Sequence, residues 1–396
     1  MRRRHVLLGW EFGSGRGHLE KLFQAGRLLA ARGHRVSYAL QRVDAGGYAG
    51  ADGATIWQAP LSPRLLVNTR KQDGIVPATL GDILGRLGLD DPGMVAGVLR
   101  AWTNILSAAQ PDLVIGDYAP LLLTAARGRV ATLASGAGFD LPPARMQSFP
   151  SLSGAPPAFD ERLLLESFNR GAAGASVAPI DRLPALFAAD VALPATFAEI
   201  DPYREHRRLP VMAPVVSDPP PPLASGRGEE VFVYIHEGLR PDAPLWAGLE
   251  RSRLPIRAYT PAATNDYVDA LERRGIAVET RPVPFPRIVE RSRLLVSHGS
   301  HGFVCSGLLA GLPHVICHYD LEKFGIAGRV AGLGLGGHVP LHAIDPDPFA
   351  ESLVRIYRDD SLAAACLAAA PDFRRRMPES VSAQLVDRAE SLVFGQ

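Results

Sequence analysis

The chain has 396 residues, of which 47% are hydrophobic and 21% charged, and its formal net charge at pH 7 is +1. That length can bury the cores of two domains, and the balanced charge gives no reason to expect a nucleic acid as partner. The three cysteines form no spaced framework, which is typical of reduced thiols in a cytosolic protein. No run approaches about 18 apolar residues, so we expect no transmembrane segment.

The first 40 residues read as a strand, a glycine-rich loop, a helix and a second strand. His5–Trp10 is a short apolar strand, and the loop 11–18 follows it. Apolar residues at 19, 22, 25, 28 and 29 then recur with a helical period, and Gly33 ends that helix before the strand 35–40. This order predicts a βα unit that leads into a neighbouring strand.

Two further buried strands are expected in the first half of the chain. Pro111–Asp117 ends at a carboxylate, and residues 132–138 form a strand and its turn. A longer helix is expected near 94–109. The segments 59–80 and 139–160 are rich in proline and irregular.

The prolines at 219–222 mark the clearest change in composition, because so stiff a run enters neither core. We therefore predict an N-terminal domain, a linker, a C-terminal domain and a final helical segment, over residues 1–217, 218–229, 230–379 and 380–396. Strands are expected at 230–235, 256–259, 277–279, 294–297 and 314–318, and helices at 243–251, 265–274, 347–358 and 380–394. This alternation predicts parallel, doubly wound α/β sheets in both halves, with ligands at the carboxyl ends of the strands.

The strand that begins at Leu294 runs into a polar turn at 298–303 and then directly into an apolar helix. Such a turn places backbone N–H groups at a helix N-terminus, where the helix dipole favours a phosphate or diphosphate. Gly299 and Gly302 let the backbone approach an anion closely, and His298 and Ser300 can add donors. The alternative is a tight structural connection that binds nothing.

Short motifs in both halves have the spacing of one enzyme family. The first half carries Gly17-His18-Leu19 and then Ala-Arg-Gly-His-Arg-Val at 31–36. The second half carries His298-Gly-x-x-Gly302, then Ala-Gly-Leu-Pro at 310–313, Arg-Val at 329–330 and Gly-Leu-Gly at 332–334. In these motifs the chain resembles the GT-B glycosyltransferases of the bacterial macrolide and flavonoid type, related to the UDP-glycosyltransferases. Residues 45–105 and 140–210 carry almost none of the resemblance.

The resemblance implies a GT-B fold, in which two Rossmann-like doubly wound domains face each other across a cleft and the final helix returns to the first domain. It implies an inverting, hexosyltransferase-type enzyme of natural-product biosynthesis in the cytoplasm. The sugar would come from a UDP- or dTDP-linked donor and pass to a hydroxyl of a small-molecule acceptor, with no metal and no cofactor. We expect no nucleic acid among the partners and no transmembrane segment. The protein could form a homodimer.

Each functional role follows from the resemblance. By this resemblance, His18 would be the base that removes the proton of the acceptor hydroxyl, and Asp117 would orient it. Val283 would meet the nucleotide base, the turn 298–303 would bind the diphosphate, and residues 322–323 would contact the sugar. The implied donor-binding residues are Gly15, Val283, His298, Gly299, Ser300, His301, Gly302, Phe303, Glu322 and Lys323.

The chemistry of these residue types agrees with such roles. A hydroxyl is a poor nucleophile at neutral pH, and a histidine held in one tautomer by a carboxylate is suited to take its proton. A leaving diphosphate needs fixed N–H donors and a helix dipole to receive its charge, so no metal is required.

Several donor positions depart from the family pattern. The second glycine of the turn is Ser300, its hydroxyl residue is Phe303, a ribose-binding glutamate is Ser306, and the sugar-binding Asp-Gln pair is Glu322-Lys323. The usual Gly-Ser turn near 236–238 reads His-Glu-Gly. A nucleotide-sugar hydrolase or epimerase, or a non-catalytic binding protein of the same fold, therefore remains an alternative.

Simpler interpretations stand beside these roles. His18 could cap a helix or face solvent, Asp117 could be the N-cap of a helix at 119–127, and Glu322 and Lys323 could form a solvated turn. A zinc site is disfavoured because no familiar ligand pair recurs among His298, His301, Cys305, Cys317 and His318. The glycines at 13–17 lack the spacing of a dinucleotide fingerprint.

Overall fold

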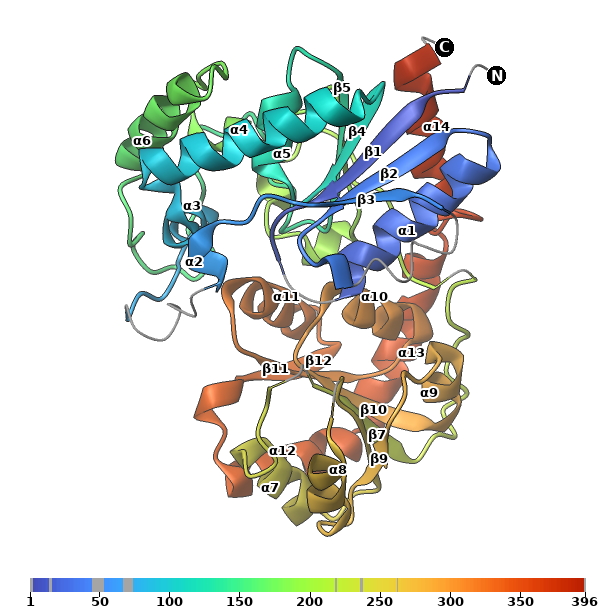
Figure 1. The fold of residues 1–396 in the computed structure, drawn as a ribbon. Helices are drawn as coiled ribbons and strands as arrows, with labels where there is room; N and C mark the ends of the chain where they lie inside the picture. The colour runs from blue at the N-terminus through green and yellow to red at the C-terminus, as the bar shows by residue number, and fades with distance from the viewer. Residues whose placement is uncertain are drawn as a thin grey trace. The chain divides into compact units, whose positions relative to one another are not determined.

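A computed structural model describes residues 3–13, 16–44, 53–66, 74–217, 219–235, 238–261 and 263–394, without the side chains of Arg16 and Leu66. The chain divides into two compact units. The first comprises Met1–Val215 together with Val381–Gln396, and the second comprises Val216–Ser380. Each unit contains its own six-stranded sheet with helices packed on it (Figure 1).

In the first unit every strand runs parallel to its neighbours, in the order β3-β2-β1-β4-β5-β6. The strands are β1 (His5–Trp10), β2 (Arg35–Leu40), β3 (Thr55–Gln58), β4 (Leu113–Asp117), β5 (Ala131–Gly136) and β6 (Val191–Pro194). The longer helices are α1 (Arg16–Ala31), α4 (Pro92–Ala109), α5 (Pro120–Ala126), α6 (Glu161–Gly174) and α14 (Val381–Phe394). Shorter helical turns are α2 (Pro63–Leu66), α3 (Leu80–Leu84), η4 (Gly85–Leu89), η5 (Leu183–Phe187), η6 (Ala198–Ile200) and η7 (Arg204–His206).

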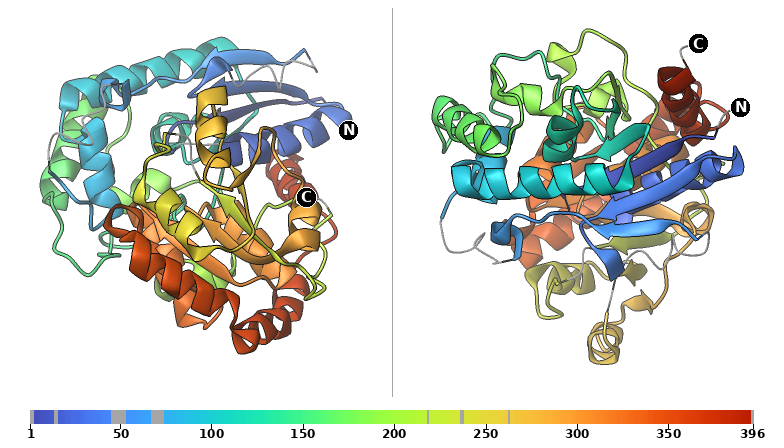
Figure 2. Two further views of the ribbon diagram at one scale, coloured as in Figure 1. Left: turned by 90° about the horizontal axis from the view of Figure 1, so that it is seen from below. Right: turned by 45° about the horizontal axis from the view of Figure 1, so that its top comes forward.

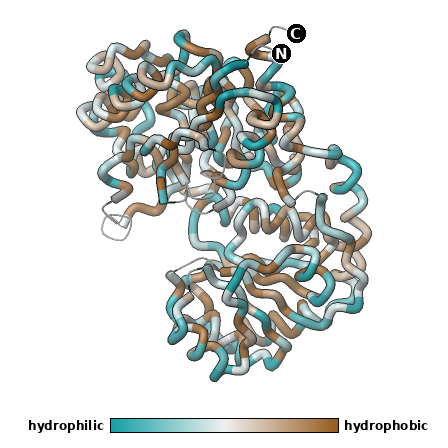
Figure 3. The backbone as a smooth tube through the Cα atoms, turned by 45° about the vertical axis from the view of Figure 1, so that its right-hand side comes forward, coloured by the Kyte–Doolittle hydropathy of each residue, from teal (hydrophilic) through white to brown (hydrophobic). Residues whose placement is uncertain are grey.

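Successive side chains of β1 point to opposite faces of this sheet. Val6, Leu8 and Trp10 belong to the core that α1 and α14 cover. On the other face, a side chain added at Gly9 would meet Trp102 of α4 and Leu122 of α5. The sheet is therefore a middle layer between two layers of helices, and hydrophobic stretches run through it (Figures 2 and 3).

The last helix, α14, is part of the first unit in both apolar and polar contacts. Its Leu385, Val386 and Ala389 lie in the core beside α1. Its Glu390 accepts a hydrogen bond from Arg32 at 2.7 Å and lies 3.0 Å from Nε2 of His34. Figure 1 shows the start of β1 and the end of α14 close together on this unit.

The second unit repeats the architecture, in the order β12-β11-β10-β7-β8-β9 and again parallel. Its strands are β7 (Glu230–Tyr234), β8 (Ile256–Tyr259), β9 (Ala277–Glu279), β10 (Ser292–Ser297), β11 (His314–His318) and β12 (Gly336–Pro340). Its helices are α7 (Pro244–Ser252), α8 (Asn265–Glu272), α9 (Phe285–Arg291), α10 (His301–Ala310), α11 (Leu321–Gly332), η8 (Leu341–Ala343), α12 (Pro346–Tyr357) and α13 (Asp360–Arg374).

The parallel, doubly wound sheets predicted from the sequence are confirmed in both units. The expected helix near 94–109 is α4, which begins after Asp91, whose side chain accepts hydrogen bonds from the N–H groups of Gly93 and Met94. The sequence analysis did not predict the edge strands β3, β6 and β12, nor the helices α6, α9, α11 and α13. No helix in the described parts of the chain is both long and apolar enough to cross a membrane.

Candidate functional site

In the first unit, the candidate site lies where the order of the strands reverses. β1 and β4 are neighbours at the centre of the sheet, and Trp10 is paired in register with Asp117 at their carboxyl ends. The loop after β1 leads into α1, whose first turn carries His18. In doubly wound folds this switch point is the usual position of a ligand.

His18 and Asp117 form a close pair. Nδ1 of His18 lies 2.5 Å from Oδ1 of the fully buried Asp117, so Nδ1 carries the proton and Nε2 is the nitrogen left to act as a base. Lys21, one turn further along α1, places Nζ 2.7 Å from Oδ2 of Asp117. Burial alone would raise the pKa of Asp117, but Lys21 and His18 outweigh it and hold that pKa below its ordinary value.

Two of the simpler interpretations do not fit these contacts. The N-cap of α5 is Ala119, so Asp117 does not cap the helix that follows it. His18 does not point into open solvent, because its side chain is only 12% exposed. The centroid of its ring lies 5.8 Å from that of Trp10 and 6.1 Å from that of Tyr118.

Gly13 lies next to Nε2 of His18, the nitrogen that is left to act as a base. A Cβ added at Gly13 would lie 2.5 Å from Nε2 of His18, and the φ of Gly13 is +87°. Only glycine fits both the space and the left-handed backbone. Because position 13 is a glycine, there is room beside the imidazole of His18. The predicted donor residue Gly15 lies outside the described residues.

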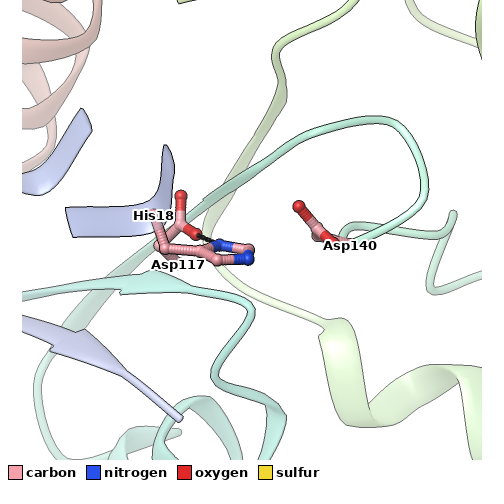
Figure 4. A group of neighbouring side chains, drawn as sticks. All are labelled: His18, Asp117 and Asp140. Carbon is pink, nitrogen blue, oxygen red and sulfur yellow. Dashed lines mark hydrogen bonds and ion pairs between the residues drawn. The ribbon is translucent and has the colours of Figure 1, made fainter. Parts of the chain in front are cut away.

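Asp140, which the sequence analysis missed, is a third member of this group. It lies in the loop after β5, is 4% exposed, and accepts a hydrogen bond at Oδ2 from the N–H of Ala137 at 3.1 Å. One potential ligand atom each of His18, Asp117 and Asp140 lies within 4.8 Å of the other two. Figure 4 shows the imidazole between the two carboxylates.

These three side chains are the one cluster with metal-ligand chemistry in the described part of the chain. Nζ of Lys21, 2.7 Å from Asp117, already supplies a positive charge there. A second cation beside it would be repelled. The arrangement therefore suits proton transfer better than metal binding.

The charges around His18 change its affinity for a proton. Burial alone would lower the pKa of His18, but the carboxylates of Asp140 and Asp117 outweigh burial and the nearby Lys21 and hold the pKa above its ordinary value. A base must be unprotonated before it reacts. The site is therefore suited to act on the alkaline side of the ordinary histidine range.

Glu11 is a second residue that the sequence analysis missed. Its buried carboxylate accepts hydrogen bonds from the N–H groups of Leu121 and Leu122 and from Nε1 of Trp102. Burial raises the pKa of Glu11 to about 8, although these three donors act in the opposite direction. Glu11 therefore holds the start of α5 next to the end of β1.

In the second unit, the turn 298–303 also follows a strand at a switch point, since β7 and β10 are central neighbours. Ser297, the last residue of β10, accepts a hydrogen bond from the N–H of Gly299 at 3.0 Å. The ring of His298 packs on Tyr234, with centroids 5.0 Å apart. Ser300 is the N-cap of α10 and makes no side-chain hydrogen bond to it.

The fold itself accounts for glycine at position 299. Its φ is +88°, and a Cβ there would lie 2.6 Å from Cγ2 of Ile316. Either feature excludes larger residues, so this glycine alone is no evidence for a bound phosphate. The turn still presents the N-terminus of a ten-residue helix, which attracts an anion.

Phe303 packs into an apolar cluster instead of facing an anion. Its ring lies 5.1 Å from that of Tyr234 and 5.3 Å from that of Phe285. Val283 packs against the same cluster. Val283 also lines a cavity of about 170 Å³ with Arg281 and Arg287, a cavity that does not include the turn 298–303.

Glu322 and Lys323 lie in the first turn of α11, next to the turn 298–303. A Cβ at Gly299 would lie 3.5 Å from Cβ of Lys323. The ammonium of Lys323 pairs with Glu322 and Asp320, and the Lys323 side chain is only 13% exposed. Burial alone would lower the pKa of Lys323, but Asp320 and Glu322 hold it above its ordinary value. This pair is therefore not a solvated surface turn.

The cysteines and histidines considered as zinc ligands do not gather. Nε2 of His301 lies 3.6 Å from Sγ of Cys305, while His318 pairs with His338 at 3.2 Å. Burial raises the pKa of the Cys317 thiol to about 12, which disfavours the thiolate that a metal requires.

The whole chain is similar to solved structures of glycosyltransferases. The calicheamicin glycosyltransferase CalG4 has a TM-score of 0.69 and 20% identity, over 100% of this chain and 99% of that one. The kitacinnamycin glycotransferase has a TM-score of 0.65 and 18% identity, over 98% and 100%. VinC, in complex with dTDP, has a TM-score of 0.60 and 15% identity, over 99% and 100%.

No family model and no curated protein sequence matches the chain. The structural likeness shows the fold, and the expected GT-B fold of two Rossmann-like, doubly wound domains is confirmed.

Proposed function

We propose that this protein is an inverting glycosyltransferase that moves a sugar from a nucleoside diphosphate to a hydroxyl of a small-molecule acceptor. His18 is the base in this proposal, and Asp117 orients it. The acceptor binds the first unit and the nucleotide binds the second. The donor is a UDP- or dTDP-linked sugar, and the reaction uses neither a metal nor a cofactor.

The observation that carries the proposal is the pair formed by His18 and Asp117 at the switch point of the first sheet. The carboxylate holds Nδ1 at 2.5 Å, and Gly13 leaves room beside Nε2. A general base needs this combination of a fixed tautomer and an accessible second nitrogen. The fold adds support, because CalG4 is a glycosyltransferase and VinC was solved with dTDP.

The reaction is a direct displacement at the anomeric carbon. The acceptor oxygen forms a bond to C1 as its proton passes to Nε2 of His18, and the bond from C1 to the diphosphate oxygen breaks. The diphosphate leaves with the electron pair of that bond. Its charge is received by the N-terminus of α10 and the turn 298–303. Attack opposite the leaving group inverts the configuration at C1.

The residues of the second unit that differ from the family pattern bear on which donor is bound. Lys323 and Glu322 form a partly buried ion pair beside Gly299, where the family places Asp-Gln. We propose that this pair contacts the sugar, since charged groups held in place near a binding turn select ligands by hydrogen bonding. The identity of the sugar is tested by comparing transfer from a panel of nucleotide-sugar donors.

Binding is tested first, by titrating the protein with UDP and with dTDP in a calorimeter. We expect one of them to bind at micromolar to low millimolar concentration. A protein that binds neither at millimolar concentration is not a nucleotide-sugar transferase.

Turnover is tested next, with nucleotide sugars and a panel of hydroxylated acceptors. His18→Ala should reduce transfer by about 100-fold or more and leave nucleotide affinity nearly unchanged, because general-base catalysis contributes about this much. His206→Ala, an exposed histidine of the same unit, is the matched control and should remain active. Free sugar released without acceptor would identify a hydrolase, and loss of nucleotide binding in His18→Ala would indicate a structural role.

A further inference from the structure

The inference concerns Asp140, which the proposed dyad of His18 and Asp117 does not include, and it rests on the proposed function. Asp140 is 4% exposed. One of its carboxylate oxygens lies within 4.8 Å of a ring nitrogen of His18 and of a carboxylate oxygen of Asp117. One of its carboxylate oxygens accepts the N–H of Ala137. The other accepts no hydrogen bond from any residue that the structure describes.

The position of Asp140 is held by the fold. The loop after β5 turns tightly, because the N–H of Asp140 donates to the carbonyl of Ala137 at 3.1 Å. Arg207 donates to the carbonyl of Gly138 at 2.9 Å and is paired with the fully buried Asp201. This support keeps a carboxylate beside the imidazole (Figure 4). A carboxylate is not buried next to a histidine without consequence for the charge of that histidine.

The charges of the group show what that consequence is. Asp117 carries a negative charge, and Lys21 at 2.7 Å cancels it. When His18 takes a proton, the three side chains together carry one uncompensated positive charge in a buried site. The negative charge of Asp140 compensates it, and the group of four becomes neutral.

We propose that Asp140 is the third member of the proton-accepting group, and that its carboxylate stabilises the positive charge that His18 acquires from the acceptor. Asp140 acts through His18, so it is a positioning and electrostatic residue, while Asp117 fixes the tautomer. The charged and titratable groups facing the ring are Asp117 of β4, Asp140 of the loop after β5, Lys21 of α1 and Tyr118 after β4.

The test measures the titration of His18 directly and does not depend on turnover. Histidine is labelled with ¹⁵N, and the ring signals of the 11 histidines are followed by NMR as pH is raised. His18 is assigned from the signals that disappear in His18→Gln. In Asp140→Asn, whose side-chain oxygen can still accept from Ala137, the midpoint of His18 should fall.

Two other variants complete the titration. Lys21→Gln should raise the midpoint of His18, because it removes a positive charge. Asp190→Asn is the matched control: Asp190 also accepts a backbone N–H, from Thr132 at the other end of β5, and its loss should leave His18 unchanged. If Asp140→Asn is unfolded by thermal melting, Asp140→Ser removes the same charge and keeps an acceptor.

The kinetic consequence separates this role from a structural one. Asp140→Asn should lower kcat/KM by about tenfold at alkaline pH, and the acid limb of its profile should move to lower pH, so that the loss shrinks as pH falls. An equal loss at every pH, or a His18 midpoint identical to that of the wild type, overturns the proposal. Failure of the proposed function is a different result, since it appears as absent nucleotide binding.

Discussion

At the scale of single residues, His18 must keep Nε2 both reachable and unprotonated to act as a base. Gly13 serves the first requirement, since any Cβ there would lie 2.5 Å from Nε2. Whether Nε2 is protonated depends on the pKa of His18, which the charges of Asp117, Asp140 and Lys21 shift. The reactivity of one imidazole therefore depends on neighbours from four segments of the chain.

Gly13→Ala should reduce the rate of sugar transfer by about 100-fold or more, because the new methyl group occupies the space beside Nε2 of His18. The affinity for nucleotide should stay the same. The positive φ adds a cost to stability of about 1–2 kcal/mol. Transfer kinetics and thermal melting measure the two effects separately.

Gly17→Ala is the matched control for this substitution. Gly17 lies in the first turn of α1 with no heavy atom near its would-be Cβ, so alanine should preserve activity and slightly stabilise the helix. An active Gly13→Ala variant would show that the acceptor does not approach His18 from this side.

Sequence reasoning reached His18 and Asp117 because each stands in a recognisable motif or at the end of an apolar strand. Asp140 and Glu11 were missed, since neither lies in a motif. Both follow the carboxyl end of a strand, however, and the carboxyl ends of parallel strands meet at one edge of the sheet. Once the order β1-β4-β5 is known, the same rule brings Glu11, Asp117 and Asp140 to that edge.

At the scale of elements, the central strands were predicted, whereas of the four edge strands only β9 was. β1, β4, β7 and β10 are buried apolar runs with a clear signal. β12 contains Gly336, Gly337 and Pro340 and is mostly half-buried, so it lacks the alternation and the branched residues that mark a strand. β3 and β6 are only four residues long and partly exposed. Their pairing is fixed by the neighbouring strand, which a local pattern cannot show.

Helix α14 makes a prediction at this scale. Leu385 is 4% exposed in the core shared by α1 and β1, so Leu385→Ala should destabilise the first unit by about 2–5 kcal/mol. Chemical denaturation followed by tryptophan fluorescence measures the change.

Leu163→Ala is the control for that measurement. Leu163 lies on α6 of the same unit and is 60% exposed, so its replacement should change stability by no more than about 0.5 kcal/mol. A change of similar size in both variants would show that α14 does not contribute to the core.

At the scale of the whole molecule, the fold presents two sheets of the same order, each with a candidate site at its own switch point. The first site carries the titratable groups, and the second carries the N-terminus of α10 with the ion pair of Lys323. In the proposed function, proton transfer belongs to the first unit and charge stabilisation of the nucleotide to the second.

Hydrogen exchange tests this division in the intact protein. With saturating UDP or dTDP, whichever binds, amides in the first turns of α10 and α11 should exchange more slowly, whereas those of α6 in the first unit should not change. Protection centred on the first unit would contradict the assignment of the nucleotide to the second.

The return of α14 to the first sheet also fixes the order in which the two units can be completed during synthesis. All of Val216–Ser380 is synthesised between the two parts of the first unit. The apolar face that receives Leu385 and Val386 therefore stays uncovered while the second unit can already close. The first unit is therefore begun before the second and completed after it, and a chain that stops before residue 381 leaves that face open to aggregation or to a chaperone.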